Sequence, residues 1–269
     1  MLYFVATPIG NLGDFSPRAR EVLEKVDLVA CEDTRTSHQL FSLLGVQVKA
    51  TTAYHDFNEE KATENLIKKL QKGLDVALVS DAGMPLVSDP GYRLVRACHE
   101  HGIPVTSVPG ANAVLTALQL SGLPTNSFYF GGFLPPKSNA RQNVLKGVAD
   151  LSATLIFYET ARRLKEALSD IQKVLGNRQM AVVRELTKKF EEVKCGTPDE
   201  MNSYYIESPK GEIVLVISGS EKENVVAPNI SISDLRKNLS AKDTAFVWSL
   251  LTGKSRKEAY NEVLEYDKL

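Results

Sequence analysis

The sequence predicts an α/β protein with two α/β domains and a small helical C-terminal region. Three observations support this prediction. Short apolar runs alternate with helical patterns over residues 1–117, an order typical of an open, largely parallel sheet. Beyond residue 118 the runs come closer together, and those at 180–183 and 192–194 are too close for a helical crossover, so we expect an antiparallel pair in a mixed sheet. The chain after residue 230 carries only helical patterns.

The first domain is expected over residues 1–117. Ser16 should cap its first helix, with Pro17 at the first helical position. The run at 76–79 is continuously apolar, as central parallel strands are. Expected strands cover 2–6, 28–31, 76–79 and 105–108, and expected helices cover 16–26, 36–44, 58–73, 90–101 and a segment that starts near residue 110.

The second domain is expected over residues 118–222. Its predicted strands cover 128–130, 154–157, 180–183, 192–194 and 213–216. Residues 221–229 are polar and contain a proline, which indicates a linker. The C-terminal region, 230–269, should hold helices at 240–251 and 255–265. Two short helices around a glycine turn are compatible with a helix-turn-helix motif, and equally with a helical hairpin that packs on the body or on a partner subunit.

Composition limits the possible environments. The 269 residues carry a net charge of -1, which gives no global electrostatic reason to bind nucleic acid. The three cysteines form neither a CxxC pair nor a zinc spacing, and this favours a reduced, cytoplasmic setting. No apolar run approaches the roughly 18 residues of a membrane span. The N-terminus lacks a basic segment and is interpreted as a first strand, not a signal peptide.

The segment 80–91 is the richest in chemistry. It follows the most apolar predicted strand, and in open α/β sheets ligands bind beyond the carboxyl ends of the strands. Its small residues allow close backbone approach, and it holds two aspartates. We expect Asp81 to contact a ligand and Asp89 mainly to cap the following helix. Segments 7–14 and 108–113 are similar small-residue loops, without the GxGxxG or P-loop pattern.

Charged clusters are further candidates. The sequence Glu32-Asp33-Thr34-Arg35 follows the second strand, where it would either cap a helix with a surface ion pair or take a buried role beside the ligand. Segments 184–188 and 210–212 flank strands of the second domain. Four cations would indicate a phosphate-binding surface only if they converge: Lys137, Arg141, Arg162 and Arg163. The four histidines show no metal spacing.

Seven segments in order over about residues 5–217 carry a resemblance: ATPIGNLGDFSPRA, ACEDTRTS, VSDAGMPLVSDPG, VPGANA, GFLPPK, RELTKKFEE and KGEIVLV. They resemble the tetrapyrrole methylase superfamily and, within it, the bacterial enzymes that methylate the ribose 2′-hydroxyl of a cytidine in 16S ribosomal RNA. The resemblance implies two α/β domains with S-adenosylmethionine in the cleft between them. It also implies a homodimer that modifies a decoding-centre cytidine of the small subunit and uses no metal.

The resemblance also implies residue roles. The cofactor is expected against Pro8, Ser80, Asp81, Ala82, Met84, Asn112, Ala113, Tyr158, Glu185, Leu186, Glu212 and Ile213. We expect Glu32 on the substrate side, with Lys188 nearby. The catalytic candidates are Asp33, Arg35, Asp89 and Arg184, and none of them is assigned as the general base.

Two departures from the family pattern concern histidine. The family usually has a Pro-His pair within the segment that here covers 158–163, and it commonly has His where this chain has Phe57. The resemblance therefore does not extend to a histidine base at either position. Two other functions stay open: a superfamily methyltransferase acting on a small tetrapyrrole-like substrate, and a non-catalytic scaffold that binds cofactor or RNA. Calorimetry with S-adenosylmethionine, followed by methyl transfer onto 30S particles that lack the modification, separates all three.

Overall fold

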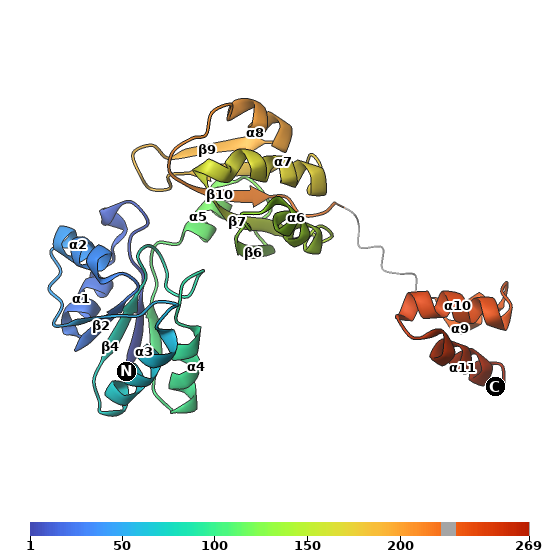
Figure 1. Ribbon diagram of the computed structural model, residues 1–269, viewed down its shortest axis with the longest axis horizontal. Coiled ribbons are helices and arrows are strands. Elements are labelled where there is room, and N and C mark those ends of the chain that lie inside the picture. Colours follow the sequence, from blue (N-terminus) through green and yellow to red (C-terminus); the bar gives the residue numbers. More distant parts are fainter. Residues whose placement is uncertain (222–229, 269) are drawn as a thin grey trace. The chain divides into compact units, whose positions relative to one another are not determined.

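The computed structural model describes residues 1–221 and 230–268. They form two compact units, Met1–Ser220 and Glu221–Leu269, which are described separately. Figure 1 shows the course of the chain through both. The linker predicted over 221–229 lies, apart from its first residue, outside the described residues.

The first sheet has the strand order β3-β2-β4-β1-β5. All of its paired strands are parallel, which confirms the predicted parallel sheet. The strands are β1 (Leu2–Val5), β2 (Leu28–Cys31), β3 (Thr51–Ala53), β4 (Val76–Val79) and β5 (Val105–Val108). Strand β3 was not predicted, because its three residues form no apolar run. It exists as an edge strand that pairs only with β2.

Helices cover both faces of this sheet (Figure 1). On one face, α1 (Pro17–Lys25) and α2 (Thr34–Leu44) pack on alternate residues of the strands, such as Val29 and Ala77. On the other face, α3 (Glu59–Gln71) and α4 (Tyr92–Glu100) pack on the intervening residues, such as Ala30 and Leu78. Because helices cover both faces, the carboxyl edge of the strands is where a ligand can reach the sheet.

The helix caps confirm one prediction and correct another. The Ser16 side chain accepts a hydrogen bond from the backbone of Ala19 at 3.1 Å, as predicted. The prediction that Asp89 mainly caps the next helix was wrong. Helix α4 begins at Tyr92, and its N-cap is Gly91, at φ 137°, with no side-chain cap. A Cβ at Gly91 would lie 2.8 Å from Leu86, so the tight turn moves the helix start beyond Asp89.

The second sheet has the order β6-β7-β10-β8-β9. Strand β6 (Phe128–Phe133) runs parallel to β7 (Thr154–Thr160), and β10 (Glu212–Ile217) runs antiparallel to both β7 and β8 (Met180–Arg184). Strand β9 (Glu192–Gly196) is antiparallel to β8. The mixed sheet and the antiparallel pair near residues 180 and 192 are therefore confirmed.

Helices α6 (Ser138–Gly147), α7 (Leu164–Leu175) and α8 (Pro198–Tyr204) cover one face of the second sheet. Helix α5 (Ala113–Leu120) covers the other face, with Val114, Ala117 and Leu118 against strands β7, β8 and β10. Two short 3-10 turns, η1 (Leu12–Asp14) and η2 (Ala161–Arg163), follow β1 and β7. The domain boundary predicted after residue 117 falls inside α5 and stays a prediction.

The C-terminal unit contains α9 (Ile232–Arg236), α10 (Ala241–Thr252) and α11 (Arg256–Tyr266). Ser240 and Ser255 cap the last two helices, which confirms both as predicted. Trp248 donates a hydrogen bond to Glu262 at 2.9 Å and so joins α10 to α11. Across residues 1–221 and 230–268, no helix is both long and apolar enough to cross a membrane.

Candidate functional site

A cavity of about 430 Å³ opens where the strand-end loops of the first sheet meet those of the second. Its volume lies within the range of ligand pockets, about 300–1,000 Å³. The first sheet contributes Ile9, Glu32, Asp81, Ala82, Gly83, Met84, Val87, Ser88, Asp89, Asn112 and Ala113. The second contributes Phe133, Tyr158, Glu159, Thr160, Val183, Leu186, Gly211, Glu212, Ile213 and Val214.

Backbone hydrogen bonds hold the first wall of the cavity together. Thr7 and Gly83 exchange two bonds, at 2.9 and 3.1 Å, which joins the loops after β1 and β4. The backbone N–H of Asp33 donates to the Asp81 carboxylate at 3.2 Å, and that of Asp81 donates to Glu32 at 3.5 Å. The carboxylates of Glu32 and Asp81 are therefore positioned by backbone, and no ion pair with a described cation involves either of them.

The second wall is aromatic and aliphatic. The ring of Tyr158 lies 4.9 Å from that of Phe130 and 5.2 Å from that of Phe133, between centroids. Leu186 is buried between Glu185 and Thr187, whose φ angles are 52° and 64°. Non-glycine residues in this region are strained, and such strain gathers at functional sites.

The first wall also has an apolar residue between two residues with left-handed φ angles. Leu86 and Ser88, with φ angles of 71° and 70°, flank Val87. Val87 and Leu186 belong to the same apolar cluster, so two strained loops bring their apolar side chains together at the cavity.

The cavity is acidic. Five carboxylates line it, and none of the described lining residues is Lys, Arg or His: Glu32, Asp81, Asp89, Glu159 and Glu212. Burial and the neighbouring Asp81 raise the pKa of Glu32, and burial raises the pKa of Asp81. The strongest effect of this kind is at Asp89, whose pKa burial and the Glu32 charge raise to about 7.

Of the residues predicted to bind cofactor, nine line the cavity: Asp81, Ala82, Met84, Asn112, Ala113, Tyr158, Leu186, Glu212 and Ile213. Pro8 and Ser80 are buried behind the first wall. Glu185 accepts a hydrogen bond from Lys188 at 2.9 Å and one from the backbone of Glu212 at 3.1 Å. Burial would raise the pKa of Glu185, but these two bonds lower it.

Only one of the four catalytic candidates lines the cavity. Asp89 lines the cavity, whereas Asp33, Arg35 and Arg184 are not among its lining residues. Asp33 caps α2, and hydrogen bonds from Arg35 lower its pKa to about 2. The Arg35 side chain is 90% exposed. Arg184 pairs with Glu192 at 3.1 Å. Of the two alternatives for residues 32–35, Asp33 therefore follows the first and caps a helix. Glu32 follows the second and lines the cavity.

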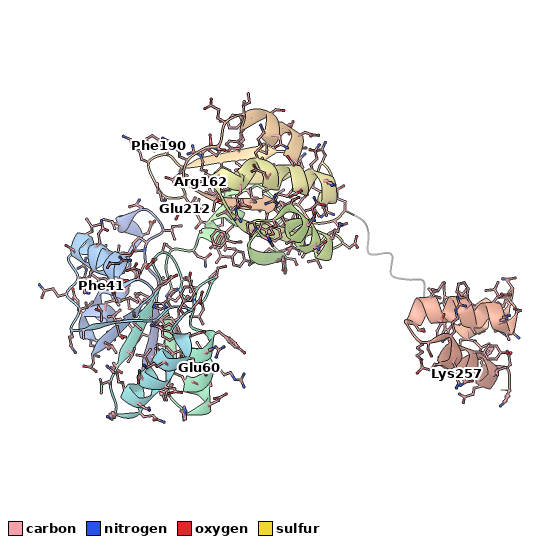
Figure 2. The ribbon with its side chains drawn as sticks, viewed as in Figure 1. Phe41, Glu60, Arg162, Phe190, Glu212 and Lys257 are labelled. Carbon is pink, nitrogen blue, oxygen red and sulfur yellow. The ribbon has the colours of Figure 1, made fainter. Side chains whose placement is uncertain are left out.

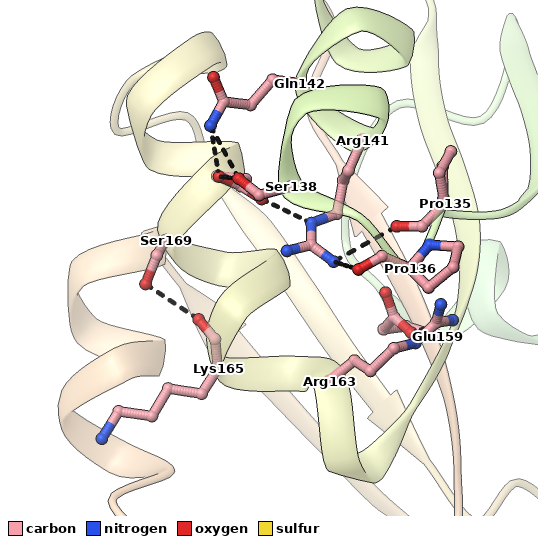
Figure 3. A network of polar contacts seen from close by, with 10 residues as sticks. Pro135, Pro136, Ser138, Arg141, Gln142, Glu159, Arg163, Lys165 and Ser169 are labelled. Carbon is pink, nitrogen blue, oxygen red and sulfur yellow. Dashed lines mark hydrogen bonds and ion pairs between the residues drawn. The ribbon is translucent and has the colours of Figure 1, made fainter.

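Two of the four cations named for a phosphate surface are bound to buried carboxylates. Arg141 is buried and donates to Asp170 at 2.7 Å and to the carbonyls of Pro135 and Pro136 (Figure 3). Arg163 pairs with the buried Glu159 at 2.6 Å. The interpretation as a basic surface was wrong for these two arginines, because each neutralises a buried carboxylate.

Exposed side chains outside the cavity include Phe190, 66% exposed, which projects from the loop between β8 and β9 (Figure 2). None of the described residues forms a group of three or more His, Cys, Asp or Glu side chains that could hold a metal ion.

Residue-by-residue reasoning missed several lining residues, among them Ile9, Val87, Phe133 and Gly211. Three of these lie within the quoted motifs ATPIGNLGDFSPRA, VSDAGMPLVSDPG and GFLPPK, and Gly211 lies in KGEIVLV. The motifs marked the segments, but the apolar residues carried no chemical signal of their own.

Known proteins resemble this chain over most of its length. Residues 1–202 match the family described as Tetrapyrrole (Corrin/Porphyrin) Methylases. The chain is 45% identical to a protein of Mesorhizobium japonicum named Ribosomal RNA small subunit methyltransferase I, over 98% of this chain and 91% of that protein. It is 44% identical to a protein of the same name from Synechocystis, over 100% and 94% of the two chains.

Solved structures share the fold at low identity. A diphthine synthase superposes with a TM-score of 0.64 at 18% identity, and covers 81% of this chain and 89% of its own. A uroporphyrin-III-C-methyltransferase from Thermus thermophilus superposes with a TM-score of 0.56 at 20% identity, and covers 80% and 93% of the two chains.

Proposed function

The chain belongs to the tetrapyrrole methylase family, and from this premise we propose that it transfers the methyl group of S-adenosylmethionine to the ribose 2′-hydroxyl of a cytidine in 16S ribosomal RNA. The observation that carries the proposal is the charge of the cavity. Five carboxylates and no described cation line a pocket whose remaining walls are mostly apolar. Such a pocket suits a ligand that joins a positive sulfonium and ammonium to an adenosine.

Several features of the cavity fit this methyl donor. Asn112 uses its side-chain oxygen to accept from the backbone of Leu115, so its amide N–H₂ is left to donate into the cavity. The buried Glu159 lines the cavity and has one carboxylate oxygen without a hydrogen-bond partner. Met84 and Leu186 offer apolar surface. When bound, the donor supplies a methyl group made electrophilic by its sulfonium.

We assign the cofactor roles accordingly. Asp81 and the backbone of its loop hold the donor from the first sheet, and Tyr158, Leu186, Glu212 and Ile213 hold it from the second. Asn112 and Ala113, at the start of α5, lie between these two groups in the chain and line the same cavity. Arg35 and Lys188, both outside the cavity, are the cations that we propose for contacts with RNA phosphate.

The substrate is proposed from the relatives and not from charge. Proteins 42–48% identical to this chain are named as methyltransferases of small-subunit ribosomal RNA. The net charge of -1 gives RNA no independent support. We further propose that the enzyme is a homodimer of the cytoplasm that acts on the small ribosomal subunit.

Two measurements test the proposal. Calorimetry should show that S-adenosylmethionine binds more tightly than S-adenosylhomocysteine, which lacks the sulfonium charge, and that added salt reduces this difference. Labelled methyl should then appear on the ribose of a 16S cytidine in 30S particles that lack the modification. Equal binding of the two ligands would contradict the proposed electrostatic role of the carboxylates. Transfer to a porphyrinoid, with none to 30S particles, would refute the RNA substrate.

A further inference from the structure

We propose that Asp89 is the general base that removes the proton from the attacking hydroxyl, a role that rests on the proposed function. The reaction requires a proton acceptor at the cavity, because a neutral hydroxyl that attacks a methyl group must lose its proton. No histidine is among the described lining residues, so the acceptor has to be a carboxylate or Tyr158. Burial raises the pKa of Tyr158 to about 12, which keeps its phenol protonated.

Four of the five cavity carboxylates are engaged elsewhere. Glu159 accepts from Arg163 at 2.6 Å and from the backbone of Thr160 at 2.7 Å. Glu212 pairs with Lys188 at 2.8 Å, and its side chain is 78% exposed. Both carboxylates are thus already paired with a cation, Arg163 for Glu159 and Lys188 for Glu212.

The other two are held by backbone. Asp81 accepts from the N–H of Asp33 and Glu32 from the N–H of Asp81, each at the end of a strand. Asp89 differs from all four. It has no ion-pair partner among the described residues, and the nearby Ser80 hydroxyl lowers its pKa less than burial and the neighbouring carboxylates raise it. It also does not cap α4, which begins three residues later at Tyr92.

The loop geometry fixes Asp89 at the cavity. Leu86 and Ser88, just before it, both adopt left-handed φ angles. A Cβ on Gly132 would lie 3.3 Å from the Ser88 hydroxyl, so the end of β6 lies directly against this loop. Strain of this kind persists only where the surroundings hold it, and it commonly marks groups whose position matters for function.

The charged groups with the largest effects on the pKa of Asp89 are carboxylates. Glu32 follows β2, Asp56 follows β3 and Asp81 follows β4, and Tyr158 on β7 faces it from the second sheet. Burial and the charges of Glu32, Asp81 and Asp56 raise the pKa of Asp89 to about 7. A base whose pKa lies near the working pH is both sufficiently ionised and sufficiently basic.

The step balances in charge. The Asp89 carboxylate takes the hydroxyl proton while an electron pair of that oxygen forms the bond to the methyl carbon. The carbon–sulfur bond breaks, and its electron pair remains on sulfur. A carboxylate and a sulfonium thus become a carboxylic acid and a neutral thioether, so the net charge of the cavity is unchanged. Asp89 then releases its proton to water.

The test compares Asp89→Asn with Asp81→Asn, its matched control in the same loop. Single-turnover methyl transfer to 30S particles is measured from pH 6 to 9 with saturating donor. Wild type should gain rate up to pH about 7 and then level off. Asp89→Asn should be slower by about 10²- to 10⁴-fold and insensitive to pH, while Asp89→Glu retains part of the rate. Asp81→Asn should weaken donor binding in calorimetry and keep a pH-dependent rate, with the rise moved to lower pH because the Asp81 charge helps to raise the pKa of Asp89.

Thermal unfolding supplies a readout that does not depend on turnover. Because the pKa of Asp89 is raised on folding, the folded state binds more protons, and ionisation of Asp89 lowers stability as pH rises from about 4 to about 7. Asp89→Asn removes that loss, so it should melt above wild type at pH 8.5 and approach it at pH 5. An unchanged rate and pH profile in Asp89→Asn, with active wild type, overturns the base alone. No transfer by wild type overturns the proposed function and the base with it.

Discussion

Replacement of Asp170 by Ala should strongly destabilise the protein. Asp170 on α7 accepts from Arg141 on α6 at 2.7 Å, and the two side chains are 9% and 3% exposed. It also accepts from Ser138 at 2.8 Å and from Gln142 at 2.7 Å. The substitution therefore leaves a guanidinium charge buried without its carboxylate (Figure 3).

The size of the effect follows from that isolated charge. Removing one partner of a buried ion pair costs about 3–5 kcal/mol. Arg141 keeps the carbonyls of Pro135 and Pro136 as acceptors, at 3.3 and 3.4 Å, so we expect the lower end, about 3 kcal/mol. That is roughly a hundredfold increase in the unfolded fraction, since about 1.4 kcal/mol corresponds to tenfold.

Urea unfolding at pH 7 measures this free energy. Asp199→Ala is the matched control, because Asp199 is an exposed carboxylate that also accepts a side-chain amide, from Asn177. It should cost less than about 1 kcal/mol. Replacing both Arg141 and Asp170 by Leu should recover much of the loss. A cost within about 1 kcal/mol for Asp170→Ala would refute the reasoning.

The pH dependence of the same variant provides a second check. Burial would raise the pKa of Asp170, but hydrogen bonds from Gln142, Ser138 and Arg141 lower it. A carboxylate with a lowered folded pKa contributes its full stability above its unfolded pKa, about 3.9, and loses it as pH falls through the folded pKa. The difference between wild type and Asp170→Ala should therefore be constant near neutrality and shrink in acid.

Three further predictions follow from packing. Phe157→Ala should cost about 4 kcal/mol in urea unfolding, because Phe157 is fully buried in the core of the second sheet; a loss below about 1 kcal/mol would mean that the site collapses without a cavity. Gly10→Ala should weaken S-adenosylmethionine binding about tenfold in calorimetry, because its Cβ would lie 2.5 Å from Lys188 and 2.9 Å from the carbonyl oxygen of Leu186. The loop after β1 and the loop after β8 must then move apart. Unchanged affinity would show that these two loops do not shape the cavity. A chain ending at Ser220 should bind the donor within about twofold of the full chain, since no described lining residue lies beyond Val214; loss of binding with the fold intact would place part of the site in the C-terminal unit.

Most of the secondary structure could be predicted from the sequence because the apolar runs are strong and well separated. The continuous run at 76–79 became the central strand β4, and the short spacing before residue 192 correctly predicted an antiparallel neighbour for β8. Strand β3 was not predicted because two of its three residues are threonine. It is a strand because it pairs with β2, not because its residues are buried.

The candidate site was predicted in place but not in detail. Small residues and aspartates after parallel strands located the cavity around Asp81, because strand ends in such sheets face a common edge. The roles of Asp89 and Arg141 were not readable. By sequence alone, Asp89 could cap the next helix and Arg141 could face water. Tertiary contacts prevent both.

The sequence by itself determined the α/β class, the order of the strands along the chain and the loops that carry the site, since these depend on local periodicity and spacing. Only the tertiary structure decided which charges meet. The turn at Gly91 moves the start of α4 beyond Asp89, and the packing of α6 on α7 buries Arg141 against Asp170. Both outcomes depend on contacts between segments distant in the chain, and such contacts decide whether a charged side chain is solvated, paired or left alone in a cavity.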